Sequence, residues 1–122
     1  MFSKKLWAWA PAVLWVAITF VVSHQPVVVI PFGAPDYVAH AVNYGILAVL
    51  LIWALANGDW SAMTMPVIAS AVGLAVLLGV GDEFHQSFIP GRTATVSDVV
   101  ADAVGAALGA CVAGLAVAMR RA

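Results

Sequence analysis

The chain has 122 residues, of which 64% are hydrophobic and 9% are charged. Soluble domains carry about 25% charged residues, so this composition excludes an ordinary water-soluble domain and predicts a single all-α membrane domain over residues 1–122. The formal net charge of −1 gives no basic surface for nucleic acid, and the single cysteine, Cys111, excludes an internal disulfide.

Four apolar segments are each long enough to cross a membrane, which requires about 20 residues. We expect spans at residues 5–23, 36–57, 62–86 and 96–119, packed as a compact four-helix bundle in a multi-pass protein. The segment 24–35 contains three prolines and is not expected to form a regular helix. The first span has the basic flank of a signal peptide. Its long apolar region and the lack of an A-x-A-like site favour an uncleaved anchor.

The distribution of lysine and arginine predicts the orientation of the spans. With four spans, four of the five basic residues fall on one side of the membrane: Lys4, Lys5, Arg120 and Arg121. Because basic loops stay in the cytoplasm, both termini are predicted to be cytoplasmic and the protein to lie in the cell membrane. Arg92 is then the one basic residue on the outer side.

The segment GDEFHQSFIPGRTATVSDVVAD, residues 81–102, holds five of the eleven charged residues in the chain. Helical geometry, at about 100° per residue, places Asp82, His85 and Gln86 on one face of the third span. Glu83 lies on the flank of that face. Ionisable side chains are costly inside a membrane, so this face is expected to meet protein and not lipid.

The second and fourth spans carry polar residues at the same predicted end. On the fourth span, Asp98 and Asp102 lie one turn apart and in line with Gly105 and Gly109. A Gly-x-x-x-Gly pair lets another helix backbone approach closely, so the two aspartates are expected to face protein. The second span begins with a similar polar stripe, formed by Asp36, His40 and Asn43. Three helices are therefore expected to direct polar groups at one another.

Helix capping is an alternative role for two of these acidic residues. Thr95-Val-Ser-Asp98 fits the [ST]-x-x-[DE] start pattern, and Asp36 follows a proline where a negative charge favours the helix dipole. Capping does not explain Asp82 and Glu83, because they approach the carboxyl end of their helix.

Arg92, across a Pro-Gly turn from the third span, is the expected counter-ion of the acidic residues. A Glu83–Arg92–Asp98 network that only joins two spans is one interpretation. We favour a functional site, because buried ion networks contribute weakly to stability. His40 considered alone fits either such a site or a hydrogen-bonded interior position.

The stretch DEFHQSFIPGRTATVSDVVADAVGAALGA closely resembles the signature of VanZ-like membrane proteins, with its Asp-Glu-x-x-Gln, Pro-Gly-Arg, Ser-Asp and Gly-x-x-x-Gly elements. The stretches FVVSHQP and DYVAHAVNYGIL resemble two further blocks of the family. The resemblance implies a membrane protein linked to low-level resistance to the glycopeptide teicoplanin. By motif, it implies roles for Glu83, Gln86, Arg92, Asp98, Gly105 and Gly109.

Two positions depart from the family pattern. Tyr37 stands where the family usually has lysine, which removes a cation. Asp102 stands where asparagine is more common, which suggests a hydrogen-bonding role that does not require an ionised carboxylate.

The leading functional hypothesis is a polar site at the outer end of the helices that engages a lipid headgroup or another cell-envelope ligand. The residues expected to form it are Asp36, His40, Glu83, Gln86, Arg92, Asp98 and Asp102. Besides the lipid membrane, such a headgroup or ligand is the only partner that the sequence suggests. A purely structural role for the same residues also remains open.

The alternative is an enzyme that performs acid–base chemistry on a lipid-linked or phosphate-bearing substrate. Glu83 or Asp82 would be the base, His85 or His40 the acid, and Arg92 would stabilise the oxyanion. A proton or cation pathway is disfavoured, because the inner halves of the spans carry no charge.

The sequence identifies no cofactor, and no ligand spacing specifies a metal. Hard divalent cations nevertheless suit oxygen-rich sites. The donors available for one are Asp82, Glu83, Asp98 and a histidine.

Overall fold

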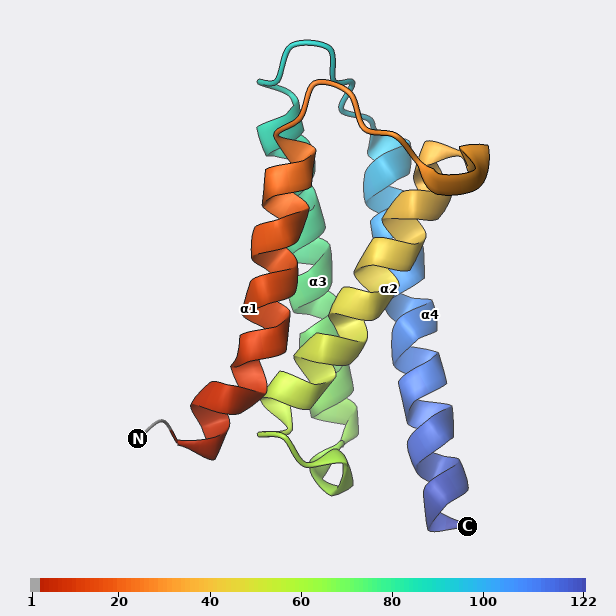
Figure 1. The fold of residues 1–122 in the computed structure, drawn as a ribbon. Coiled ribbons are helices and arrows are strands. Elements are labelled where there is room, and N and C mark those ends of the chain that lie inside the picture. Colours follow the sequence, from red (N-terminus) through yellow and green to blue (C-terminus); the bar gives the residue numbers. More distant parts are fainter. Residues whose placement is uncertain (1–2) are drawn as a thin grey trace.

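A computed structural model describes residues 3–122. These residues form four α-helices, shown in Figure 1: α1 (Lys4–Ser23), α2 (Asp36–Leu55), α3 (Met65–Gln86) and α4 (Val96–Arg121). Two short 3-10 helices, η1 (Pro31–Gly33) and η2 (Trp60–Ala62), lie in the loops. All four α-helices are long and apolar enough to span a membrane, and residues 3–122 contain no strand. The prediction of an all-α four-helix membrane protein is therefore confirmed.

The helix starts follow from local capping chemistry. Ser3, Thr64 and Thr95 precede α1, α3 and α4, and each side chain accepts a hydrogen bond from a backbone amide in the first turn. The third helix begins at Met65, later than predicted, because residues 60–62 form η2 with Asp59 as its cap. The other predicted boundaries agree with the structure within two residues.

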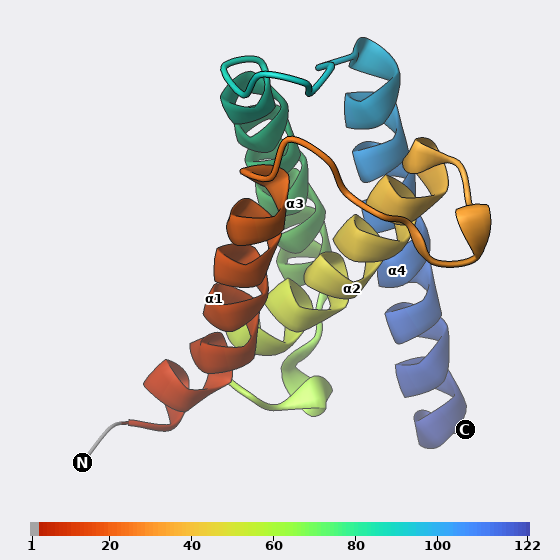
Figure 2. The ribbon, with the colours of Figure 1, turned by 45° about the horizontal axis from the view of Figure 1, so that its top comes forward.

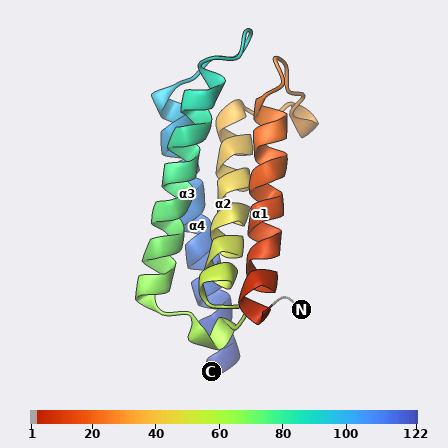
Figure 3. The same cartoon turned by 90° about the vertical axis from the view of Figure 1, so that its left-hand side faces the viewer.

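One end of the bundle gathers the carboxyl ends of α1 and α3 and the amino ends of α2 and α4. We call it the polar end. The proline-rich segment 24–35 crosses this end, and η1 is its only helical part, as the sequence predicts. Figures 1 and 3 show that the start of α1 and the end of α4 are both at the opposite end of the bundle.

Helix α2 is the central helix, because it packs against each of the other three and most extensively against α4. Figure 2 shows it crossing the bundle obliquely. A Cβ atom added at Gly105 would collide with the backbone of Ala41, and one added at Gly109 with the backbone of Gly45. The close helix approach predicted from Gly-x-x-x-Gly is thus confirmed, and it brings the amino-terminal halves of α2 and α4 together.

The buried core and the outer surface are both apolar, as expected in lipid. The largest fully buried apolar or aromatic side chains, Tyr44, Leu47, Leu51 and Ile52, all come from α2. Large apolar side chains are exposed along every α-helix, including Phe84 on the face of α3 opposite the acidic residues, and Phe88 is exposed in the turn that follows α3. The polar residues of α3 therefore point into the protein, as the 100° periodicity predicts.

Candidate functional site

Five of the six acidic residues of the chain lie at the polar end. Four of them, Asp82, Glu83, Asp98 and Asp102, are buried, with exposed fractions between 1% and 6%. The fifth, Asp36, is exposed on the first turn of α2. Burying charged groups is costly unless they are paired, so the partners of these carboxylates determine what the site can do.

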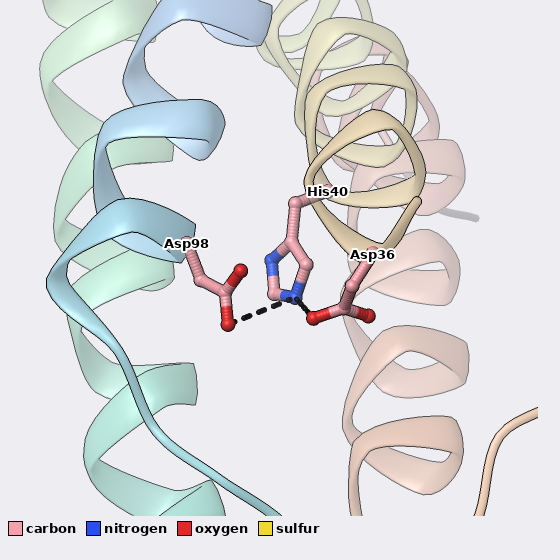
Figure 4. A group of neighbouring side chains, drawn as sticks. All are labelled: Asp36, His40 and Asp98. Atoms are coloured by element: carbon pink, nitrogen blue, oxygen red, sulfur yellow. Dashed lines mark ion pairs between the residues drawn. The ribbon is translucent and has the colours of Figure 1, made fainter. Parts of the chain in front are cut away.

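His40 is the residue around which the carboxylates gather. Its Nδ1 donates a hydrogen bond of 2.8 Å to Oδ1 of Asp102. Its Nε2 lies 3.5 Å from Oδ2 of Asp36, 3.9 Å from Oε1 of Glu83 and 3.9 Å from Oδ2 of Asp98. Figure 4 shows the imidazole between the carboxylates of Asp36 and Asp98, which come from α2 and α4. We call these five residues the His40 cluster.

The start of α4 is held so that the Asp98 side chain remains free to face His40. The Thr95 hydroxyl accepts a hydrogen bond from the Asp98 amide at 3.2 Å, as the capping pattern predicts. The Thr95 amide itself donates to Oε2 of Glu83 at 3.1 Å. In a capping box the acidic residue of the first turn would accept that amide hydrogen bond. Here α3 supplies the acceptor, and Asp98 combines a place in the cap with a place in the His40 cluster.

Arg92 forms no direct ion pair with the acidic residues of the described chain, although the sequence suggests it as their counter-ion. Its Nη1 donates to the backbone oxygens of Ser23 at 3.4 Å and Gln25 at 3.1 Å, and it forms no ion pair within residues 3–122. The last carbonyl groups of a helix lack partners within the helix, and a nearby arginine satisfies them. The expected Glu83–Arg92–Asp98 network is therefore wrong, and Arg92 joins the α3–α4 loop to the end of α1.

His85, a candidate acid, lies outside the His40 cluster. Its Nε2 shares a 3.3 Å hydrogen bond with Nδ1 of His24, and the two rings stack with centroids 5.4 Å apart. The Phe20 ring lies 5.7 Å from the His85 ring, so this part of α3 faces α1. Asn43 also turns to α1, where its Oδ1 accepts from the Thr19 hydroxyl at 3.3 Å.

Asp82 and Gln86 form a second polar group beside the His40 cluster, between α3 and α1. The Gln86 amide donates to Oγ of Ser23 at 3.4 Å and to Oδ2 of Asp82 at 3.5 Å. Asp82 and Gln86 are each 2% exposed, and Oδ1 of Asp82 has no hydrogen-bond partner within residues 3–122. The structure thus divides the predicted site residues into two adjacent groups.

A cavity of about 260 Å³ lies between α1, α2 and α3 at the polar end. Its apolar lining comes from α1 and the segment after it, namely Trp15, Ile18, Val22, Val28 and Ile30. Its ionisable and amide lining is Asp36, His40, Asn43, Asp82, Gln86 and Arg92. The cavity therefore has an apolar wall on one side and charged groups on the other. His40 lies between the cavity and the carboxylates of Glu83, Asp98 and Asp102.

Sequence reasoning missed two residues of this region. Ser23 bonds Gln86 through its hydroxyl and Arg92 through its carbonyl, yet the sequence shows it only as a residue of the FVVSHQP block. Tyr44 lines the cavity, is 1% exposed and donates to the backbone oxygen of Leu78 at 3.5 Å. Its position four residues after His40, on the same helix face, was the signal that could have identified it.

Donor atoms suited to a metal ion lie close together in the His40 cluster. One set contains Asp36, His40 and Asp98, and a second contains His40, Glu83 and Asp102. Within each set the donor atoms lie within 4.8 Å of one another. Asp82, which the sequence suggests as a possible metal donor, belongs to neither set.

These features define a class of protein: a small all-helical membrane protein with a buried histidine–carboxylate cluster at one end of its four spans. A model of the VanZ/LLP1 family matches residues 8–117, which include the His40 cluster and most of each span. The chain therefore belongs to the VanZ/LLP1 family, as its sequence blocks indicated. No curated protein and no solved structure matches the chain.

Proposed function

We propose that the cavity at the polar end binds the polar headgroup of an envelope lipid or lipid-linked ligand. The observation that supports this is the amphipathic lining of the cavity. Trp15, Ile18 and Val22 of α1 provide a surface for an acyl chain, while Asp36, Arg92 and the groups beside them suit a charged or hydrogen-bonding headgroup. Pockets for small ligands combine an apolar lining with a few placed polar groups in this way.

The proposed orientation puts this cavity at the outer face of the cell membrane. Four of the five basic residues lie at the end of the bundle opposite the polar end, within α1 or α4. The positive-inside rule then makes both termini cytoplasmic. A ligand would reach the cavity from the outer leaflet.

Cysteine labelling tests this orientation. In a Cys111→Ala background, we expect Thr93→Cys and Val29→Cys to react in intact cells with a membrane-impermeant thiol reagent. Both positions are exposed in loops at the polar end. Ala62→Cys, exposed in η2 at the opposite end, should react only after the cells are opened. The reverse pattern would place the cavity at the cytoplasmic face.

Within the proposed function, ligand engagement at the outer leaflet affects susceptibility to teicoplanin. Glycopeptides act on lipid-anchored cell-wall material outside the membrane, so a protein that holds an envelope lipid at that surface can alter their effect. The VanZ-like sequence blocks support this proposal, because the resemblance implies a link to teicoplanin resistance.

A cavity-filling substitution tests ligand binding. Ala39 lines the cavity, so Ala39→Phe should occupy part of its volume while leaving the His40 cluster in place. We expect at least about a tenfold loss of lipid retained by the detergent-purified protein, measured by native mass spectrometry, and loss of the teicoplanin tolerance conferred on a susceptible host.

The matched control is Ala17→Phe, at an exposed position of α1 that does not line the cavity. It should retain lipid and tolerance at the level of the unaltered protein. Equal lipid retention and equal tolerance in the two folded variants would contradict binding in this cavity.

A second candidate function is acid–base catalysis on a lipid-linked or phosphate-bearing substrate. Oε1 of Glu83 favours it, because this oxygen has no hydrogen-bond partner within residues 3–122 and lies 3.9 Å from Nε2 of His40. Since His85 pairs with His24, the geometry favours His40 over His85 as the acid. The Glu83 substitutions described in the Discussion distinguish this enzyme from a binding protein.

A further inference from the structure

We propose that the His40 cluster binds a divalent transition-metal cation, Zn²⁺ or Mn²⁺, with Nε2 of His40 as its nitrogen ligand. The proposed oxygen ligands are Oδ2 of Asp36, Oδ2 of Asp98 and Oε1 of Glu83. They come from α2, α4 and α3, so the cation would join three of the four helices. Figure 4 shows how the two aspartates approach Nε2 from opposite sides.

The distances around Nε2 fit an ion placed among these atoms. The three oxygens lie 3.5, 3.9 and 3.9 Å from Nε2. Ligands about 2.0–2.2 Å from a tetrahedral Zn²⁺ are about 3.4 Å from one another. Each of these distances to Nε2 therefore needs to shorten by only a few tenths of an ångström. Glu83, which is grouped with His40 and Asp102, would also move toward Asp36 and Asp98 when the ion binds.

Asp102 occupies the place that a supporting carboxylate takes behind a metal-binding histidine. A histidine that binds a metal through one ring nitrogen almost always donates a hydrogen bond through the other, which fixes the ring and its tautomer. His40 donates from Nδ1 to Asp102 at 2.8 Å, which leaves the lone pair of Nε2 directed at the other three carboxylates.

An unpartnered buried oxygen independently points to a ligand. Glu83 is 6% exposed, and its Oε2 accepts from the Thr95 amide. Its Oε1 has no hydrogen-bond partner within residues 3–122, yet this is the oxygen that approaches Nε2 of His40. A buried acceptor left without a partner is costly, and a cation at this point would satisfy it.

The charge of the cluster also favours a bound cation. Four carboxylates surround His40, and no lysine or arginine within residues 3–122 forms an ion pair with them. Arg92 is occupied by backbone carbonyls at the end of α1. Buried charges are expected to be paired or to coordinate a metal. The cation can enter from the cavity, which Asp36 and His40 line.

The donor set selects the class of metal. Imidazole suits Zn²⁺ and other transition metals, whereas Mg²⁺ and Ca²⁺ prefer sites made only of oxygen. One nitrogen and three carboxylate oxygens match Zn²⁺ or Mn²⁺. Cysteine takes no part, because the single cysteine, Cys111, is exposed on α4.

Cation binding by the unaltered protein is the primary test. Protein purified in detergent and stripped with a chelator is titrated separately with Zn²⁺, Mn²⁺, Mg²⁺ and Ca²⁺. Metal content, Mn²⁺ electron paramagnetic resonance and the unfolding temperature are then measured. We expect one equivalent of Zn²⁺ or Mn²⁺, with the Tm raised by about 5–15 °C at 100 times the Kd.

Either of two results would overturn the proposal. One is an unchanged Tm with no bound equivalent of any of the four cations. The other is tighter binding of Mg²⁺ or Ca²⁺ than of Zn²⁺ and Mn²⁺, which would exclude His40 as a ligand.

A matched pair of aspartate substitutions tests the location. Asp98→Asn removes a charged ligand but keeps the backbone amide that Thr95 caps, so the start of α4 should persist. We expect its Kd for the bound cation to rise about 10–100-fold. Asp59→Asn makes the same change in the loop at the opposite end and should leave the Kd unaltered. Equal Kd values in the two variants would place the cation elsewhere.

The cation site does not depend on the proposed ligand of the cavity. Metal content and Tm are measured without lipid, whereas lipid retention by the Ala39→Phe variant is measured without added metal. A negative result for cation binding therefore does not contradict lipid binding in the cavity, and a negative result for lipid binding does not contradict the cation site.

Discussion

Replacement of His40 by alanine should lower the free energy of unfolding by about 3–5 kcal/mol, the range for leaving a buried charged group, here the Asp102 carboxylate, without its partner. His40 is 8% exposed, and its hydrogen-bond partner Asp102 is 1% exposed. The substitution would leave Oδ1 of Asp102 without its 2.8 Å bond, beside an Oδ2 that has no partner within residues 3–122. The remaining carboxylates of α3 and α4 would then have no imidazole between them.

Unfolding by SDS titration in mixed micelles measures this loss, and a second histidine supplies the control. His24 is exposed and bonds another side chain, so His24→Ala removes the same group at the surface. We expect it to cost less than about 1 kcal/mol. A similar loss in the two variants would show that the His40 cluster contributes little to stability.

The Arg92→Ala variant tests whether Arg92 or His40 is the main partner of the buried carboxylates. Its cost should be intermediate, about 1–3 kcal/mol, because it removes hydrogen bonds to the carbonyls of Ser23 and Gln25 and breaks no ion pair. If Arg92→Ala proved as destabilising as His40→Ala, Arg92 would regain the role of counter-ion that the sequence suggested.

The fold was predictable because each span is defined by its own composition. The lengths of the apolar segments correctly predicted the positions of all four helices. The start of α3 was predicted three residues too early, and the reason is local. Asp59 caps a separate 3-10 turn at residues 60–62, which interrupts a stretch that is otherwise apolar enough to continue a helix. Proline content likewise identified residues 24–35 as a segment without an α-helix.

Within the candidate site, helix faces were predictable and partners were not. The 100° periodicity correctly predicted that Asp98 and Asp102 face another helix, since both are buried. Periodicity gives no information on where a loop side chain turns. Arg92 could therefore not be assigned to the carbonyls at the end of α1. His40 stayed ambiguous for the same reason, since its carboxylate partners on other helices become visible only when α2, α3 and α4 are packed.

The departure at position 102 is consistent with the geometry. The sequence suggested that Asp102 acts by hydrogen bonding, because the resemblance to VanZ-like proteins implies asparagine more often at this position. In the structure, Oδ1 of Asp102 accepts from Nδ1 of His40, and an asparagine Oδ1 can accept the same bond. In this chain, position 102 thus supplies an acceptor that fixes the His40 ring.

Substitutions of Glu83 should separate its structural role from any chemical one. Oε2 of Glu83 accepts from the amide of Thr95, the residue that caps α4. Glu83→Ala removes this acceptor and should lower the free energy of unfolding by about 2–3 kcal/mol. Glu83→Gln keeps an oxygen for that amide and leaves a proposed cation with three other ligands. It should cost less than about 1 kcal/mol in the SDS titration.

The Glu83→Gln variant, once shown to be folded, decides between the two proposed functions. A glutamine cannot accept a proton as a catalytic base. General acid–base catalysis typically contributes about 10²–10⁴-fold to a rate, so an enzyme that uses Glu83 would lose nearly all activity. A binding protein keeps its apolar wall and the remaining polar groups of the cavity, because Glu83 does not line it. We therefore expect the minimum inhibitory concentration of teicoplanin to stay within about threefold of that given by the unaltered protein. If tolerance disappears while the folded Glu83→Gln variant still retains lipid and binds the cation as the unaltered protein does, binding alone is insufficient and Glu83 is the base.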